Sequence, residues 1–149
     1  MVEHPDLLEA ASTVRQAVHR LSRRMRLERG ESGLTQQQFT LLSHLRRSSP
    51  LTPGELAAAE RVQPQSLTRA ILSLEQAGFV TRATHPDDGR SALLAITGEG
   101  RRALTQDIRG RDLWLAAAMA TELTRTEMEL LRLAAELMAR LATSDAGRA

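Results

Sequence analysis

The chain has 149 residues, 42% of them hydrophobic, a length that fits one domain with one hydrophobic core. Its 20 basic residues are all arginine and stand against 18 acidic ones, so the net charge of +2 excludes a strongly cationic protein. The absence of cysteine excludes disulfide bonds, thiolate metal ligands and thiol-based peroxide sensing, and an aromatic content of 2% favours helices packed through aliphatic side chains.

The first predicted helix runs from residue 7 to about residue 30. Its apolar residues are spaced alternately by four and three, as in a coiled-coil seam. They are Leu7, Ala11, Val14, Val18, Leu21 and Met25. The spacing alone leaves open whether this stripe packs inside one subunit or against a second copy.

The next two helices are predicted from their start signals. Thr35 and Gln38 match a capping box, and the helix that they begin ends before Pro50. Thr52-Pro53-Gly54-Glu55 combines a capping threonine, a proline at the first helical position and a glutamate three residues after the cap. The short helix that follows is expected to end near Glu60.

A fourth helix follows after a tight turn. It begins at Pro64, has an apolar stripe of Leu67, Ile71 and Leu74, and is stopped by Gly78. Two short helices joined by so tight a turn form a helix-turn-helix.

The remaining elements are a hairpin and two helices. Residues 79–84 and 90–96 are predicted strands, and the segment 85–89 between them is rich in chain-reversing residues. Helix restarts at residues 97–100, and Thr124-Arg125-Thr126-Glu127 caps a last helix that spans residues 124–143. The predicted fold is mainly α with a small β-hairpin wing, a winged helix-turn-helix with helices at both ends.

The exposed faces of this segment suit a DNA duplex. Glutamine and arginine can bond base edges bidentately, serine and threonine can bond bases or phosphates, and a helix N-terminus favours a phosphate. An arginine at a hairpin tip can enter the minor groove, and a neighbouring aspartate can hold its guanidinium extended. The predicted DNA-binding residues are Gln63, Gln65, Ser66, Thr68, Arg69, Arg82, Asp88, Arg90 and Ser91.

Several segments, in this order and spacing, resemble the multiple antibiotic resistance regulator (MarR) family. They are Leu51-Thr52-Pro53-Gly54-Glu55-Leu56-Ala57, Ser66-Leu67-Thr68-Arg69, Leu74-Glu75-Gln76-Ala77-Gly78-Phe79-Val80, His85-Pro86-Asp87-Asp88-Gly89-Arg90 and Ile96-Thr97-Gly98-Glu99-Gly100. The resemblance covers nearly the whole chain, read as a single domain, residues 1–149. It implies a triangular homodimer with a winged helix-turn-helix lobe at 35–100 and dimerisation helices at 7–30 and 124–143.

The resemblance also implies a function. Such regulators bind a palindromic operator and usually repress neighbouring genes until a small molecule releases them. By motif, Ser66, Thr68 and Arg69 match recognition-helix positions, and Asp88 with Arg90 matches the wing's Asp-x-Arg signature. Gln63-Pro64-Gln65 departs from the small polar residues that are commoner there, which leaves the operator sequence open.

Four residues lie on helices that border the family's effector cleft, and they are candidates for contact with a small aromatic or lipophilic effector. They are Arg15, His19, His44 and Trp114. A lone histidine on a helix is more often a structural residue, and Trp114 fits a core position equally well. No metal and no cofactor is expected.

The partner and the compartment follow from the same features. Double-stranded DNA and a second copy of the chain are the expected partners. The first residues carry Glu3 and Asp6 where a secretory signal would have a basic start, and no stretch reaches a membrane-spanning length. A cytoplasmic protein with no membrane contact is therefore expected.

Three other functions compete with this interpretation. A winged-helix regulator without small-molecule control would carry the same residues. An enzyme is disfavoured because the chain has no nucleophile motif, phosphate-binding glycine loop or metal-spaced cluster, and the adjacent Asp87 and Asp88 on a turn point apart. A non-specific chromatin protein is disfavoured by the modest net charge and the hydrogen-bonding face of the fourth helix.

Overall fold

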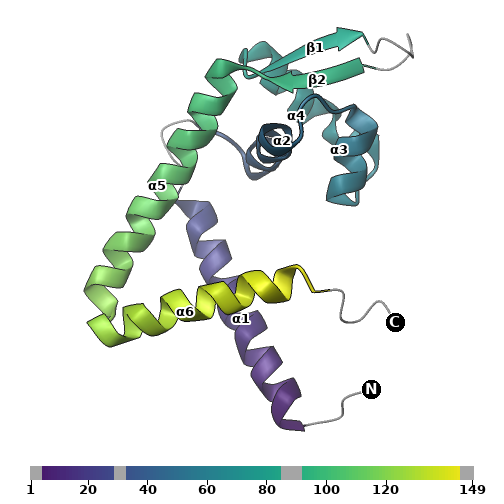
Figure 1. Ribbon diagram of the computed structural model, residues 1–149. Coiled ribbons are helices and arrows are strands. Elements are labelled where there is room, and N and C mark those ends of the chain that lie inside the picture. Colours follow the sequence, from purple (N-terminus) through teal and green to yellow (C-terminus); the bar gives the residue numbers. More distant parts are fainter. Residues whose placement is uncertain (1–4, 29–32, 85–91, 145–149) are drawn as a thin grey trace. The chain divides into compact units, whose positions relative to one another are not determined.

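The computed structural model describes residues 5–28, 33–84 and 92–144 (Figure 1). Its elements are α1 (Pro5–Leu27), α2 (Gln36–Arg47), α3 (Pro53–Glu60), α4 (Pro64–Gln76), β1 (Val80–Thr84), β2 (Ala92–Ile96), α5 (Gly98–Glu122) and α6 (Arg125–Ala142). The predicted fold class, mainly α with a two-stranded hairpin, is confirmed. The predicted turn 85–89, together with Arg90 and Ser91, lies outside the described residues.

The chain divides into two compact units, residues 1–112 and 113–149, with the boundary inside α5. In the first unit, α2, α3 and α4 gather on one side of the antiparallel hairpin of β1 and β2 (Figure 1). The second unit contains the end of α5 and the whole of α6.

Three helices begin with the capping box that the sequence predicts. At α2 the backbone N–H of Thr35 donates to Oε1 of Gln38 at 2.8 Å, and that of Gln38 donates to Oγ1 of Thr35 at 3.3 Å. Thr52 and Glu55 repeat the reciprocal pattern at α3. Thr124 and Glu127 do so at α6. Each box satisfies two backbone donors that would otherwise have no partner in the first turn.

The cap of α6 has a consequence for titration. Hydrogen bonds from the backbone and the side chain of Thr124 lower the pKa of the Glu127 carboxyl. A carboxyl with a lowered pKa in the folded state stabilises that state above its ordinary pKa, and this stabilisation is lost as the pH falls through the lowered value. We therefore expect a carbon-13 NMR titration of Glu127 to give a midpoint below the ordinary glutamate value. Thr124→Ala should move the midpoint back towards it, and a midpoint at or above the ordinary value in the intact chain would contradict the cap.

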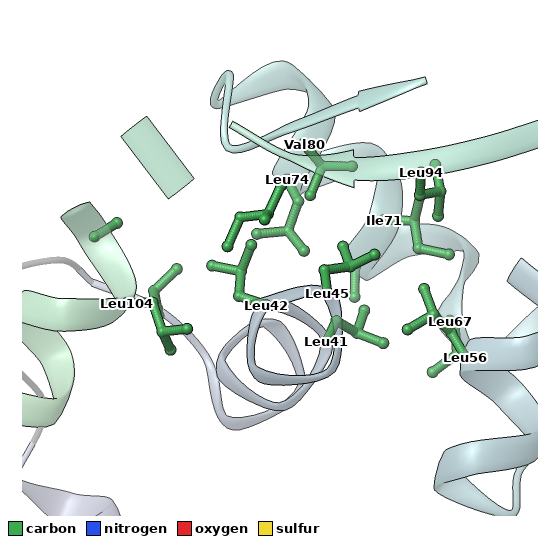
Figure 2. Packing of buried hydrophobic residues seen from close by; sticks show 14 of the residues in the cluster. Leu41, Leu42, Leu45, Leu56, Leu67, Ile71, Leu74, Val80, Leu94 and Leu104 are labelled. Atoms are coloured by element: carbon green, nitrogen blue, oxygen red, sulfur yellow. The ribbon is translucent and has the colours of Figure 1, made fainter. Parts of the chain in front are cut away.

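The hydrophobic core of the first unit lies around α2. In Figure 2, leucines of α2 occupy the middle, with Leu104 of α5 on one side and Leu56 and Leu67 on the other. The predicted apolar stripe of α4 is confirmed as buried, and Ala70 joins it. The core consists of Leu34, Leu41, Leu42, Leu45, Leu56, Ala57, Leu67, Ala70, Ile71, Leu74, Val80, Leu94, Ile96, Ala103 and Leu104.

Helix α4 ends at Gln76, and Gly78 stops it as predicted. Gly78 has φ of 73°, a left-handed conformation that costs glycine little. The N–H of Phe79 donates to the carbonyl of Leu74 at 2.9 Å, and the N–H of Gly78 donates to that of Glu75 at 3.0 Å. These two bonds form a Schellman motif, which turns the chain directly into β1.

The hairpin has one pairing that the sequence did not predict. Leu51, just before α3, exchanges two backbone hydrogen bonds with Leu94 of β2, at 3.0 and 2.8 Å. This bridge adds a third, one-residue strand beside β2 and ties the entry of α3 to the hairpin.

Helix α5 begins in close contact with the end of α4. The side chain of Thr97 accepts a hydrogen bond from the N–H of Gly100 at 3.0 Å and donates one to the carbonyl of Gly78 at 2.7 Å. The N–H of Thr97 donates to the carbonyl of Phe79 at 3.0 Å. The start of α5 is therefore held against the chain that links α4 to β1.

Candidate nucleic-acid interface

The polar face around the N-terminal half of α4 is exposed. Gln63 precedes the helix as its N-cap residue and Pro64 occupies its first turn. Five of the side chains that the sequence predicted as DNA contacts lie on α4 or at its N-cap, outside the core, and all five are exposed. They are Gln63, Gln65, Ser66, Thr68 and Arg69. The structure thus brings these five residues together on α4 and its N-cap, around the N-terminal half of the helix.

Helix α4 is held in place by α2. Nε2 of Gln37 donates to the backbone oxygen of Ser66 at 3.2 Å, and Nε2 of Gln38 donates to Oγ of Ser73 at 2.9 Å. Gln38 therefore serves both the cap of α2 and the attachment of α4. Because these bonds act beside a buried apolar stripe, the polar face of α4 is presented on a rigid support.

The turn between α3 and α4 is tight. Arg61 has φ of 55°, a left-handed conformation that is uncommon outside glycine, and its N–H bonds to carbonyls at the end of α3. The N–H of Val62 donates to the carbonyl of Ala57 at 3.0 Å. This turn sets the direction in which α4 leaves α3.

Arg82 on β1 was predicted to contact DNA, and the structure pairs it with Glu75 of α4. Nε of Arg82 donates to Oε1 of Glu75 at 2.6 Å, and Nη2 donates to Oε2 at 3.3 Å. These hydrogen bonds raise the pKa of Arg82 above its ordinary value. The pair joins the wing to the C-terminal half of α4, a role that the sequence analysis missed.

A shallow hollow of about 340 Å³ lies beside the outer face of α4. Leu72 is 52% exposed at this hollow, and sequence analysis did not single it out. A signal existed, because Gln65, Thr68 and Leu72 are spaced by three and four residues and so share one face of the helix. The lining includes Pro53, Gln65, Thr68, Leu72, Glu75 and Arg82.

A buried ion pair lies on α5 near α2. Nη2 of Arg111 is 2.8 Å from Oδ2 of Asp107, and the carbon of its guanidinium lies 4.0 Å from the centroid of the Phe39 ring. Asp107 is completely buried and Arg111 nearly so. This cluster links α5 to α2 and was also missed by the sequence analysis.

The four predicted effector residues have different surroundings. Nη2 of Arg47 lies 3.0 Å from Nδ1 of His44, so Nδ1 accepts, and Nε2 is left to donate to Glu60 on α3. Arg15 and His19 are exposed on α1. Trp114 is half-buried and belongs to the second unit, whereas the other three belong to the first. Their grouping into one pocket stays a prediction.

The described ranges were also predicted to hold no metal site and no membrane-spanning helix. No group of three histidine or acidic side chains there is arranged to hold a metal ion. No helix within the same ranges is both long and apolar enough to span a bilayer. Asp88, Arg90 and Ser91, predicted at the wing tip, lie outside the described residues.

Comparison with known proteins points in the same direction as the geometry. The sequence profile of the MarR family matches residues 34–92. An HTH-type transcriptional regulator of Mycobacterium tuberculosis is 44% identical over 128 residues, or 86% of this chain and 89% of that protein. The HTH-type transcriptional repressor MdtR of Bacillus subtilis is 30% identical over 112 residues, covering 75% of this chain and 70% of the repressor.

Solved structures share the fold. A transcriptional regulator protein from Pseudomonas aeruginosa PA01 superposes with a TM-score of 0.82 at 31% identity, over 95% of this chain and 99% of that chain. Apo MarR from E. coli superposes with a TM-score of 0.68 at 24% identity, over 83% of this chain and 94% of that one.

Proposed function

The chain belongs to the MarR family of transcriptional regulators, and from this premise we propose that it represses neighbouring genes by binding a palindromic operator as a homodimer. Regulators of this family bind DNA, so the chain is a DNA-binding regulator and not an enzyme. The observation that carries the finer proposal is the exposed polar face of α4, backed by a stripe that is buried in the core. The cytoplasm is its proposed site of action.

In this proposal α4 enters the major groove. Gln65 and Arg69 are the side chains able to bond base edges, and Ser66 and Thr68 can bond either a base or a phosphate. The wing carries Arg90 to the adjacent minor groove, with Asp88 holding its guanidinium extended. Gln63, the N-cap residue of α4, and Ser91, which follows Arg90 in the sequence, are proposed as further contacts.

The homodimer is proposed from the two terminal helices. α1 and α6 contain no buried residue among those described. Their exposed large hydrophobic residues are Leu7, Leu8, Val14, Val18, Leu21 and Leu27 on α1, and Leu130, Leu133, Leu137 and Leu141 on α6. Apolar faces of this extent favour a second copy as cover, so helices 7–30 and 124–143 form the proposed dimer contact. Residues 35–100 form the winged lobe of the same proposed single domain.

Release by a small effector is the last part of the proposal. An effector relieves repression only if it prefers a spacing of the two lobes that cannot reach both grooves. Arg15, His19, His44 and Trp114 are the proposed contacts. The alternative, a regulator without small-molecule control, predicts that phenolic and lipophilic acids shift neither the operator affinity nor the melting temperature.

The test of the proposed function is selection of bound fragments from random and genomic DNA, followed by footprinting. We expect a site with two-fold symmetry whose half-site centres are about 34 Å apart, one turn of the duplex. Equal affinity for all fragments would contradict sequence-specific binding, and an asymmetric site would contradict the homodimer.

Two arginines should carry much of the recognition. Arg69→Ala and Arg90→Ala are each expected to weaken operator binding by about 1 to 3 kcal/mol, the usual loss for a base contact. Fluorescence anisotropy at one fixed salt concentration measures the loss, because the affinity for DNA depends steeply on salt. The control is Arg109→Ala. Arg109 is an exposed arginine of α5, and its substitution removes one positive charge at a position outside the proposed interface. Losses no larger than that of Arg109→Ala would exclude these roles.

A further inference from the structure

Leu72 is exposed where a helix surface is otherwise polar. In the described part of residues 33–112, Val62 and Leu72 are the exposed large hydrophobic side chains. Leu72 lies one turn beyond Thr68 and two beyond Gln65, on the same outward line of α4. The core does not use it, because the buried stripe of α4 consists of Leu67, Ala70, Ile71 and Leu74.

The surroundings of Leu72 form a small apolar contact surface. The hollow beside it is also lined by Ile71, Pro53 and Pro64, together with the polar Gln65 and Thr68. The side chain of Leu72 therefore borders a concave place on the face that the proposed function turns towards DNA.

The pairing of Glu75 with Arg82 excludes base recognition by the Glu75 carboxylate. A glutamate on a recognition helix can accept a hydrogen bond from the amino group of cytosine. Both carboxylate oxygens of Glu75 are bonded to Arg82, at 2.6 and 3.3 Å, and the guanidinium balances its charge. The apolar Leu72 is then the group on this line, beyond Thr68, that is available to a base.

We infer that Leu72 selects thymine in each half-site by contact with its 5-methyl group, the apolar group that distinguishes this base in the major groove. The inference rests on the proposed function, since it assumes that α4 lies in that groove. It adds a specificity-determining residue whose signal is shape and apolarity, whereas Gln65 and Arg69 act through hydrogen bonds.

Replacement of thymine by deoxyuridine tests this directly, because it removes the methyl group and keeps every hydrogen-bonding group of the base pair. In the operator found by fragment selection, each symmetric pair of thymines is replaced in turn. For the chain with Leu72, one pair is expected to weaken binding about fourfold per half-site, or about 15-fold together, as for loss of one buried methyl group. Leu72→Ala should bind the unmodified operator more weakly by a similar factor and show no further loss at that pair.

Two further variants control the result. Val62→Ala, which shortens the other large hydrophobic side chain exposed in the described part of residues 33–112, should keep the full sensitivity to deoxyuridine, and Leu72→Met should keep most of it. Circular dichroism verifies that each variant is folded. If binding is specific but every thymine pair is insensitive, or if Leu72→Ala remains as sensitive as the unchanged chain, the inference is overturned while the proposed function stands. If no fragment is bound specifically, both are overturned.

Discussion

Replacing Arg111 with alanine is expected to lower the free energy of unfolding by about 3 to 5 kcal/mol, the usual cost of breaking a buried ion pair. Asp107 is 0% exposed and Arg111 is 8% exposed, and the atoms that pair are 2.8 Å apart. The substitution leaves the carboxylate of Asp107 in the interior without this cation. It also removes the guanidinium that lies over the ring of Phe39. Urea-induced unfolding followed by circular dichroism, at one protein concentration, measures the change.

A matched control exists on α6. Arg132 and Glu136 have the same spacing of four residues and a distance of 2.7 Å, but their side chains are 68% and 63% exposed. Arg132→Ala should therefore cost less than about 1 kcal/mol. The double variant Asp107→Leu with Arg111→Met should recover most of the loss, because it leaves no charge in the interior. Equal losses for Arg111→Ala and Arg132→Ala would refute the expected role of burial.

The burial of this pair could not be predicted from the sequence. An aspartate four residues before an arginine on a helix is typical of a solvated face. Part of the cover of Arg111 comes from the approach of α2, where Phe39 packs against the core and lies under the guanidinium. That approach is a contact between residues far apart in the chain, which the local pattern of charges does not encode.

Local signals, by contrast, were predicted well. The capping boxes at Thr35, Thr52 and Thr124 and the stop at Gly78 depend on residues within a few positions of one another, and the structure confirms them. The bridge from Leu51 to Leu94 depends on two segments that only the fold brings together, and it was missed. The helices and strands were therefore predictable, and the hydrogen bonds between segments far apart in the chain were not.

In the candidate interface, too, the features set by local sequence were predictable and those set by contacts between distant segments were not. The outward face of α4 follows from the spacing of its buried leucines, so the exposure of Gln65, Ser66, Thr68 and Arg69 was predictable. The pairing of Arg82 with Glu75 joins a strand to a helix, and the sequence indicated only a basic residue on the wing. The exposure of Leu72 was not predicted, because a leucine on a helix is usually buried in the core.

Gly100→Ala is expected to destabilise the protein by about 3 kcal/mol, although alanine is ordinarily the better helix former by about 1 kcal/mol. A Cβ at Gly100 would lie 2.2 Å from the carbonyl oxygen of Phe79 and 3.0 Å from Cγ1 of Ile96. The oxygen cannot move away freely, because it accepts the hydrogen bond from the N–H of Thr97 that fixes the start of α5. For a chain of this length, the melting temperature should fall by about 6 to 12 °C.

Gly98→Ala distinguishes this steric conflict from a general effect of glycine in α5. A Cβ at Gly98 would meet only the end of the Arg102 side chain, at 3.8 Å, which is an ordinary contact. Both glycines lie in the first turn of the helix, so both substitutions carry a similar gain in helix propensity, and only that at Gly100 meets backbone. We expect Gly98→Ala to leave the melting temperature unchanged or to raise it slightly. If both variants were equally stable, α5 could shift away from the hairpin at little cost in free energy. The close contact of Gly100 with the backbone of Phe79 would then not constrain the position of the wing.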